Sequence, residues 1–498
     1  MNSDRVKRPN ILYIFSDQHA ARVMGCAGDT AADTPNLDRL ANEGTRFTRA
    51  YCPSPVCLPA RMSMLTGKMP YEQSCWTNDD ILDSAIPTWL HGLGATGYQP
   101  ALVGRMHSLG PDQMRGYVQR PIGDHSPTWP GVHRRSLGVL KNTNSPLVDS
   151  ITKSGVGQSS YQVMDQDILA QSLSFLKNYA DSDRAEPFCL SVSFMLPHAP
   201  YVANQEDFDA VKDSVQPPSQ PQAPNNEHPW IRTWREAKEI SATSTEDVMR
   251  ARRGYYGLVR QLDRHIGSLL SVLDDNDLAN DTLVVYVSDH GDHIGERGLF
   301  WKHTFFEESI KVPLIMRWPD RIPAGAEQHQ PVSTGSLGNT ILSLVGALEL
   351  PNASMRSFAD LLDGQAVAPL KETPIFIEHC TDDLPSWAEG YSVQQRAVIW
   401  GRYKLVYYHS YPMQLFDLQD DPLERIDLID NPKFEELRAE LLNLILLHWS
   451  PEKIAAKIEC RKADKKLLRA WAEATHPVYA NRWHVVEDQN YLTNSPPS

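Results

Sequence analysis

The sequence predicts an α/β protein in which helices cover both faces of a mostly parallel sheet, followed by a smaller α+β unit. Three observations predict this fold class. Short apolar runs alternate with amphipathic stretches over most of the chain. Two of the runs, at 10–17 and 282–289, end in an aspartate, as buried parallel strands do at their carboxyl ends. Beyond about Leu370 the runs become short and alternating, which is typical of antiparallel hairpins.

The elements before residue 108 follow from local signals. Residues 10–17 form the first predicted strand, and 34–44 form a helix with Thr34 as N-cap, Pro35 in its first turn and Gly44 as its stop. The other elements predicted here are a strand at 45–52, a helix that begins at Cys57, and a helix, a glycine-rich turn and a strand between 84 and 107.

The middle of the chain contains two segments without a clear period. Residues 108–160 are expected to form loops over one end of the sheet, and the proline-rich residues 212–235 are expected on the surface. The regular elements predicted around them are a helix at 165–180, a strand at 188–198, a helix at 245–273 and a strand at 281–289. Apolar residues at helical spacing mark the core face of the long helix: Leu258, Leu262, Ile266, Leu269 and Leu273.

We predict three parts along the chain. Residues 1–370 form the large α/β domain, and residues 371–459 form a subdomain in which a helix at 432–449 packs on antiparallel strands. Residues 460–498 form a polar tail rich in aromatic residues. Its length and composition lead to the hypothesis that the tail reaches a neighbouring subunit of a homo-oligomer and completes the pocket of that subunit.

The composition of the 498-residue chain excludes some classes of partner. The formal charge is −14, from 62 acidic and 48 basic residues, which argues against nucleic acid and against an anionic membrane surface. A small anionic substrate stays compatible, because a basic pocket can lie inside an acidic protein. Seven cysteines do not suggest a disulfide framework, so reduced thiols are expected. Without a recognisable signal peptide or membrane span, we expect a cytoplasmic protein.

Polar residues gather where strands are predicted to end. Asp17 and Gln18 close the first strand, and Asp289 and His290 close a late strand. The carboxyl ends of strands in such a sheet converge on one crevice, where ligands bind. Carboxylates beside an amide suit a hard divalent cation, Ca²⁺ or Mg²⁺, better than zinc. The alternative is that each aspartate only caps the following helix, but two on separate strands favour a metal site.

Cys57 opens a predicted helix, so backbone N–H groups and the helix dipole face its side chain. Arg61 lies four residues later, on the same face of the helix. Such a place binds anions and lowers the pKa of a thiol. A buried structural cysteine is the more common fate of a free thiol, but the position at a helix start argues for a reactive group.

The stretch CLPARMSMLTG, residues 57–67, resembles the signature of the type I, formylglycine-dependent sulfatases. It contains the pattern C-x-P-x-R, then four residues, then T-G. In that family a formylglycine-generating enzyme oxidises the cysteine, and the hydrate of the resulting aldehyde is the nucleophile. The resemblance therefore assigns this role to Cys57. It also implies an alkaline-phosphatase-like fold, a large mixed sheet between helices, with residues 1–370 as the catalytic domain.

The resemblance extends over most of the chain, and residues 110–113 and 295–314 are most similar to choline-sulfatases and phosphonate monoester hydrolases. The implied metal ligands are Asp17, Gln18, Cys57, Asp289 and His290, which would hold Ca²⁺, with Mg²⁺ and Mn²⁺ as alternatives. The implied catalytic residues are Cys57, Arg61, Arg105, His107, His198 and Lys302. The sequence departs from the family pattern at Gln18, where a second aspartate is usual, and at Arg105, where a lysine is usual.

The resemblance implies a hydrolase of O-sulfate monoesters, either of a sulfated carbohydrate or of a small alkyl sulfate such as choline sulfate. Lys302 and Arg105 would bind the sulfuryl oxygens, and His198 would protonate the leaving alcohol. Arg61 would orient the two hydroxyls of the hydrate, and His107 would take the proton of the second one. Two alternatives stay open: a phosphonate monoester or phosphodiester hydrolase with the same residues, and a non-catalytic binder in which the cysteine is never oxidised.

The sequence does not determine the substrate. A choline group would need an aromatic cage or carboxylates, and the tryptophans in predicted loops are Trp76, Trp129, Trp230 and Trp234. A sulfated carbohydrate would instead use residues 108–160 and 201–240 as specificity loops. Weaker pocket candidates are His293, His303, Glu378 and His379.

Overall fold

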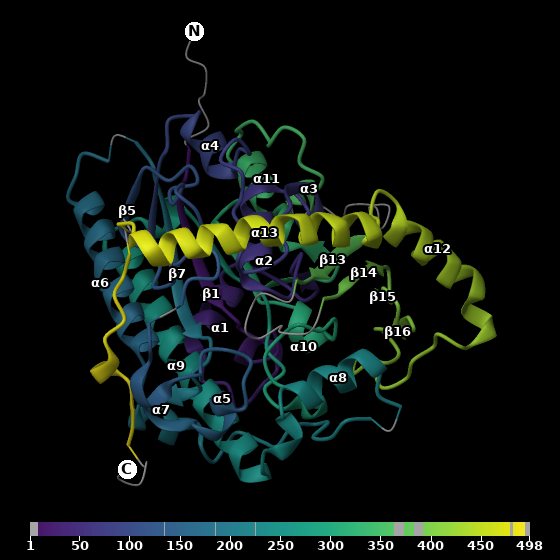
Figure 1. Cartoon of the computed structure of the whole chain (residues 1–498). Helices are drawn as coiled ribbons and strands as arrows, with labels where there is room; N and C mark the ends of the chain where they lie inside the picture. The colour runs from purple at the N-terminus through teal and green to yellow at the C-terminus, as the bar shows by residue number, and fades with distance from the viewer. Residues whose placement is uncertain are drawn as a thin grey trace.

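The computed structural model describes residues 8–133, 135–184, 186–224, 226–362, 373–382, 392–478 and 482–493. A mixed eight-stranded sheet forms its centre (Figure 1). In the order of hydrogen-bonded neighbours the strands are β11 (Ala326–Gln328), β2 (Thr45–Phe47), β10 (Leu314–Arg317), β9 (Thr282–Ser288), β1 (Asn10–Asp17), β7 (Phe188–Pro197), β4 (Gln99–Gly104) and β5 (Gln119–Ile122). Within this sheet β10 is antiparallel to both neighbours and the other pairs are parallel, which confirms the predicted sheet.

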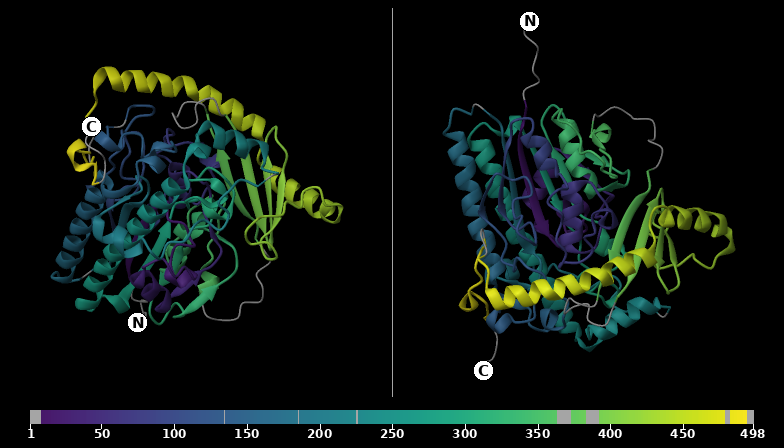
Figure 2. Two further views of the ribbon diagram at one scale, coloured as in Figure 1. Left: turned by 90° about the horizontal axis from the view of Figure 1, so that it is seen from below. Right: turned by 45° about the horizontal axis from the view of Figure 1, so that its top comes forward.

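Helices cover both faces of the sheet, as predicted (Figure 2). One face packs on α1 (Pro35–Asn42), α6 (Ser160–Ala180) and α9 (Thr245–Asp275), and the other on α2 (Cys57–Thr66), α4 (Trp89–Gly94) and α11 (Leu337–Leu344). Successive side chains of β1 enter the two cores in turn, with Tyr13 on one face and Ile14 on the other. The predicted core stripe of α9 is fully buried, and all seven cysteines are free, as expected.

Short elements fill the segments between these layers. The remaining strands of the large domain are β3 (Ala50–Tyr51), which pairs with β12 (Val332–Ser333), and β6 (Gly155–Gln158), which pairs with β8 (Val202–Ala203). The remaining helices are α3 (Pro70–Gln73), α5 (Asp149–Thr152), α7 (Gln205–Val211), α8 (Pro229–Ala237) and α10 (Glu307–Ile310). Residues 108–160 are largely irregular, as expected.

The prediction that residues 212–235 lie on the surface is wrong in part. Helix α8 begins inside this segment, and its Trp230, Ile231 and Trp234 are buried. Proline at the first helical position starts α8, and its apolar residues lie on one face that packs into the core. The prolines obscured a short amphipathic helix.

The C-terminal subdomain contains the predicted antiparallel hairpins. Its sheet has the order β13 (Ile375–Cys380), β14 (Gln394–Trp400), β15 (Tyr403–Tyr408) and β16 (Gln414–Asp417), and α12 (Glu435–Leu446) packs on it. The domain boundary expected near Leu370 lies outside the described residues, and the division into three parts stays a prediction.

Helix α13 (Pro451–Thr475) differs from the polar tail expected after residue 459, because one continuous helix crosses that position. Ser450 caps it by accepting the Lys453 N–H, and Pro451 occupies the first turn. It runs across the molecule from the C-terminal subdomain toward β5 (Figures 1 and 2). Among the described residues, no helix combines the length and the apolar character that crossing a membrane requires.

The described part of the tail packs on its own chain. β17 (Tyr491–Leu492) pairs with β6, and the side-chain oxygen of Asn490 accepts the Ser160 N–H at 2.8 Å. Trp483 donates its indole N–H to Asp167 of α6 at 2.8 Å. These tail residues pack against β6 and α6 of their own chain. A contact of the tail with a neighbouring subunit stays a prediction.

Candidate active site and metal centre

Cys57 lies at the first position of α2, as predicted, and is almost completely buried. Val56 before it is extended (φ −141°, ψ 136°), so the helix begins at Cys57. The side-chain oxygen of Asn78 accepts the Leu58 N–H at 3.0 Å, which satisfies a free amide of the first turn. All ten residues of α2 are buried, which fixes its first residue in space.

Asp17 and Asp289 come together because their strands are neighbours. β1 and β9 are parallel, and the residues just before the two aspartates are paired in register. The donor atoms of Asp17, Cys57, Asp289 and His290 all lie within 4.8 Å of one another, and all four side chains are buried. Two carboxylates and an imidazole beside Cys57 form a donor set that fits a divalent cation.

The thiol of Cys57 has a lowered pKa, which is the direction expected from the sequence, but neighbouring side chains rather than the helix start account for it. Burial and the Asp17 carboxylate act to raise the pKa, whereas the Lys302 cation lowers it, and the net value lies below the ordinary one. The sulfur lies 3.1 Å from Nε2 of His290. In a protein oxidised at this position, the formylglycine oxygens would stand in for this sulfur beside the cluster.

The guanidinium group of Arg61 joins the two carboxylates. Its Nε donates to Oδ2 of Asp289 at 2.8 Å, and its Nη2 donates to Oδ2 of Asp17 at 3.0 Å. Its Nη1 donates to the backbone oxygen of Arg105 at 2.9 Å. Arg61 is fully buried and is not among the residues that line the cavity. Arg61 therefore balances the charge of the Asp17 and Asp289 carboxylates from the protein interior rather than from the cavity.

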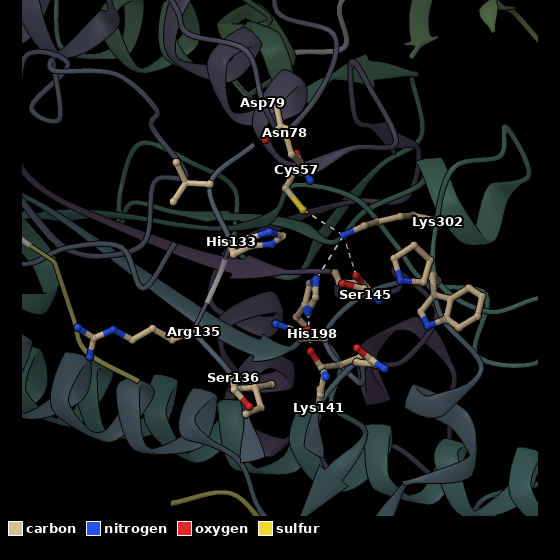
Figure 3. A pocket seen from close by; sticks show the side chains of 18 of the residues that line it. Cys57, Asn78, Asp79, His133, Arg135, Ser136, Lys141, Ser145, His198 and Lys302 are labelled. Carbon is tan, nitrogen blue, oxygen red and sulfur yellow. Dashed lines mark hydrogen bonds between the residues drawn. The ribbon is translucent and has the colours of Figure 1, made fainter. Parts of the chain in front are cut away.

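The ammonium group of Lys302 lies where the acceptors of the site converge (Figure 3). Its Nζ is 2.9 Å from Oε1 of Gln18 and 3.0 Å from the sulfur of Cys57. It is also 3.0 Å from Nε2 of His290 and 3.4 Å from Nε2 of His198. Acceptors that converge on one position are prearranged for positive charge, which is a second indication that the donor set fits a cation.

The side-chain amide of Gln18 is oriented by Asp292, a residue that sequence reasoning missed. Gln18 Nε2 donates to Oδ2 of Asp292 at 2.6 Å, so its oxygen faces Lys302. The same carboxylate oxygen accepts the Tyr201 hydroxyl at 2.6 Å, and Oδ1 accepts the N–H groups of Ile294 and Trp301. Asp292 lies three residues after Asp289, in the same polar segment, which was the only signal in the sequence. Its pairing with Gln18 is visible only in the side-chain contacts of the folded chain.

Protonation in the cluster suits metal binding. Burial raises the pKa of Asp17, but Arg105 and the neighbouring cations outweigh it, so this pKa lies well below its ordinary value. Burial lowers the pKa of His290 to about 4, against the opposing effect of Asp289. His290 Nδ1 lies 3.1 Å from the backbone oxygen of Gly291, to which its N–H donates. The neutral ring therefore presents an unprotonated Nε2 to the cluster, where it accepts from Lys302.

His198 follows the end of β7 and faces the cavity with one ring nitrogen. Its Nδ1 lies 2.6 Å from the backbone oxygen of Ala199 and donates to it, which leaves Nε2 as an acceptor toward Lys302. Burial, and then Lys302, lower the pKa of His198. The Lys302 ammonium, which lies 3.4 Å from this nitrogen, is thus a second candidate for the proton donor.

Arg105 and His107 form a second group beside the cluster. Arg105 donates to Oδ2 of Asp17 at 2.7 Å and to Nδ1 of His107 at 2.6 Å. The backbone N–H of His107 donates to Oδ1 of Asp124 at 3.0 Å, and Asp124 is fully buried. Asp124 lies in the aperiodic segment 108–160, where the sequence gave no signal for it.

A cavity of about 390 Å³ opens above these residues. Cys57, Gln18, Arg105, His198 and Lys302 line its floor. Its wall includes Asn78, Asp79, His133, Arg135, Lys141 and Arg469, the last from α13. Of the weaker candidates, His303 lines the cavity, whereas Glu378 and His379 lie in β13 and His293 is buried away from it.

The structure brings all ten predicted site residues together at one end of the sheet, every one of them buried. Their individual roles stay predictions. The four tryptophans of the predicted loops do not gather around the cavity: Trp76, Trp230 and Trp234 are buried in hydrophobic clusters, and Trp129 packs edge-on against Trp471.

Comparisons with known proteins agree with this geometry. Residues 9–347 match the family model Sulfatase, and residues 295–448 match the C-terminal model of N-sulphoglucosamine sulphohydrolase. The chain is 31% identical over 480 residues to a choline-sulfatase of Rhizobium meliloti, covering 92% of this chain and 90% of that protein. It is 29% identical over 445 residues to an ulvan-active sulfatase of Formosa agariphila, covering 88% of this chain and 80% of that protein.

Solved structures share the fold. A phosphonate monoester hydrolase of Silicibacter pomeroyi superposes with a TM-score of 0.74 at 22% identity, covering 89% of this chain and 95% of that one. A protein solved with D-glucosamine-2-N,6-O-disulfate superposes with a TM-score of 0.70 at 20% identity, covering 91% and 99%. The family match over most of the chain, around a buried Cys57 with its metal-site cluster, leads to one conclusion: the chain belongs to the sulfatase family, a family of sulfuric ester hydrolases.

Proposed function

We propose that this protein hydrolyses O-sulfate monoesters, with formylglycine made from Cys57 as the nucleophile. The observation that carries the proposal is the place of Cys57, whose sulfur lies among the metal-site donors and 3.0 Å from the Lys302 ammonium. A sulfate ester carries negative charge on its oxygens, and its alkoxide leaving group is poor. Cations at the sulfuryl group and a proton source for the leaving oxygen answer both needs.

The residues of this chain divide the work as follows. Lys302 binds a sulfuryl oxygen and, with His198 as its partner, supplies the proton to the departing alcohol. An aldehyde hydrate offers two hydroxyls, one to attack sulfur and one whose electrons expel sulfate. His107 takes the proton of the second hydroxyl, at Nδ1, once Arg105 has turned its donor from this nitrogen to a sulfuryl oxygen. In this scheme, the binding of Arg105 to the substrate frees Nδ1 of His107 to act as the base.

We propose Ca²⁺ as the resident cation, held by Asp17, Gln18, Asp289 and His290 together with the modified Cys57. Oxygen donors with one neutral imidazole suit a hard ion, and Mg²⁺ and Mn²⁺ stay as alternatives. When bound, such an ion supplies charge that stabilises the developing anion. Arg61 holds the two carboxylates in place for it.

The cavity supports a hydroxyl-rich or anionic alcohol such as a sulfated sugar rather than choline. Its wall presents His133, Arg135 and Lys141, and Asp79 contributes one carboxylate (Figure 3). Arg469 lines the same cavity. Among the described residues that line the cavity, a quaternary ammonium group would meet several cationic side chains and a single carboxylate, that of Asp79. Its volume of about 390 Å³ lies within the range of small-molecule sites.

The test is sulfate release by protein co-expressed with a formylglycine-generating enzyme, which is the partner that we propose for maturation. Substrates are sulfated sugars, choline sulfate and a matched pair of aryl sulfate and aryl phosphonate esters. We expect turnover of sulfated sugars and the aryl sulfate by the wild type and by Cys460→Ser, an exposed cysteine that serves as control. Cys57→Ser should release no sulfate catalytically. Turnover of the phosphonate alone would contradict the proposal.

Reduced cysteines throughout the chain are compatible with the cytoplasmic location expected from the sequence. Fractionation of cells that express the native gene would test this location, and light scattering would test for a homo-oligomer.

A further inference from the structure

The loop that follows His107 is held by a residue from the far end of the chain. Arg482 donates from Nε to the Thr128 hydroxyl at 3.1 Å and from Nη2 to Oε1 of Gln113 at 2.9 Å. Its Nη2 also lies 3.4 Å from the backbone oxygen of Ser108. The Arg482 side chain is 4% exposed, so these are interior contacts. One guanidinium group therefore joins three points of the segment 108–128.

Asp124 connects this arginine to the active site. Its Oδ2 lies 3.6 Å from Nη1 of Arg482 and accepts Nη2 of Arg120 at 2.6 Å. Its other oxygen accepts the backbone N–H of His107 at 3.0 Å and lies 3.8 Å from Nε of Arg105. A single fully buried carboxylate therefore ties Arg482 to the two residues beside the metal cluster.

His107 needs such support because its backbone lies in the left-handed region, with φ of +59°. This conformation is costly for a residue other than glycine and persists only when its surroundings hold it. Asp124 accepts its backbone N–H, and Arg105 donates to its ring. If Arg105 turns to the substrate, the Asp124 contact still holds the backbone from which the ring projects.

We propose that Arg482 is a positioning residue for His107, acting through Asp124, so that the C-terminal segment is part of this chain's own active site. Only the kinetic consequence rests on the proposed function. Other contacts also hold the segment: the backbone N–H of Trp483 donates to the Asp124 backbone oxygen at 3.0 Å, and β17 pairs with β6. Replacing the guanidinium group should therefore loosen His107 without releasing the segment.

The variants are Arg482→Met, which keeps the apolar stem, and Arg482→Lys, which keeps the charge but not the fork. Arg461→Met is the matched control, because Arg461 of α13 contacts the backbone oxygen of Ser74, away from His107. The first measurement is the rate at which diethylpyrocarbonate modifies His107, followed by peptide mass spectrometry. We expect a faster rate in Arg482→Met, a smaller increase in Arg482→Lys and none in the control. An unchanged rate in Arg482→Met would overturn the proposal, whether or not the protein is a sulfatase.

The second measurement separates the two halves of turnover on an aryl sulfate. We expect Arg482→Met to lower kcat about tenfold with little change in KM, as loss of a supporting contact does. Because His107 acts after the alcohol has left, the variant should release one equivalent of alcohol in a burst before slow sulfate release. A parallel fall in burst and steady state, with a lower melting temperature, would indicate a merely structural role. If the wild type releases no sulfate, the proposed function fails, and the His107 modification rates still decide this proposal.

Discussion

Gln18 donates its side-chain N–H to Asp292 at 2.6 Å, and this hydrogen bond turns the amide oxygen, not the nitrogen, toward Lys302 beside the metal-site donors. An amide can ligate a cation only through oxygen. If Gln18 is a ligand, as we propose, its amide needs a partner that fixes its orientation, and Asp292 is positioned to be that partner.

We expect Asp292→Asn to weaken metal binding. Asparagine would keep one oxygen for the N–H groups of Ile294 and Trp301, so its nitrogen would face Gln18 and reverse the amide. Supporting residues of this kind change metal affinity by about 10- to 100-fold. Isothermal titration of the metal-free protein with Ca²⁺ measures the loss, with the surface variant Asp209→Asn as control. Equal affinities would show that Asp292 does not orient the amide.

Arg61→Met should destabilise the metal-free protein strongly. The change leaves Asp17 and Asp289 without the guanidinium group that joins them, and both are fully buried. Breaking such a buried pair costs about 3–5 kcal/mol of unfolding free energy. Urea unfolding measures it, and added Ca²⁺ should restore part of the loss. Arg39→Met, which breaks a half-exposed pair with Glu43, should cost no more than about 1 kcal/mol.

Removal of divalent cations should abolish activity and lower the melting temperature. The donor cluster then retains two carboxylates balanced by Arg61 and Lys302 without the ion that completes it. A cation at about 100 times its dissociation constant should add about 2.7 kcal/mol of stability. Melting temperature against Ca²⁺ concentration measures this effect. Asp289→Asn should not respond; if it responds like the wild type, the ion binds elsewhere.

Arg105→Lys should lower kcat and change the ratio of sulfatase to phosphonate hydrolase activity. Arg105 reaches Asp17 and His107 at once, whereas a lysine amine can serve these two acceptors less well. The family that this sequence resembles usually has lysine at this position, so the variant should keep measurable activity at the lower kcat. Rates on matched aryl sulfate and aryl phosphonate esters give the ratio. An unchanged ratio would separate Arg105 from the choice of substrate.

Glu378→Gln should be more stable, relative to the wild type, at high pH. Burial raises the pKa of Glu378 to about 7, against the lowering effect of Arg396. The folded state therefore binds this proton more tightly, and wild-type stability falls as the pH rises from about 4.5 to about 7. The variant should lack this fall, which is at most about 3 kcal/mol. Urea unfolding at pH 5 and pH 8 measures it, with the exposed Glu436→Gln as control, and parallel curves for all three proteins would contradict it.

Features with a local signal could be predicted from the sequence. A β-branched run that ends in Asp289 marks a strand and its ligand edge together, and the helix start at Cys57 fixes the direction of the thiol. Long-range pairing then followed from the rules of parallel sheets, which place Asp17 beside Asp289.

Contacts between segments of irregular structure could not be predicted. Asp124 lies in a segment without hydrophobic periodicity. Arg482, which pairs with it at 3.6 Å, is more than 350 residues away in the sequence. Helix α13 was missed because its buried residues, such as Ile454 and Ile458, are few among many charged ones. Such polar helices are stabilised by the surface they lie on, which the sequence does not describe.

The burial of helix α2 has a consequence for timing. Once the chain has folded, Cys57 is only 1% exposed and is reached through the cavity that it lines. An enzyme that oxidises it therefore meets it most readily while that region is still open. Helix α13, whose Arg469 lines the cavity, and the segment with Arg482 are synthesised several hundred residues after Cys57. If Cys57 is oxidised as we propose, the interval before these segments close over it would be the window for that reaction.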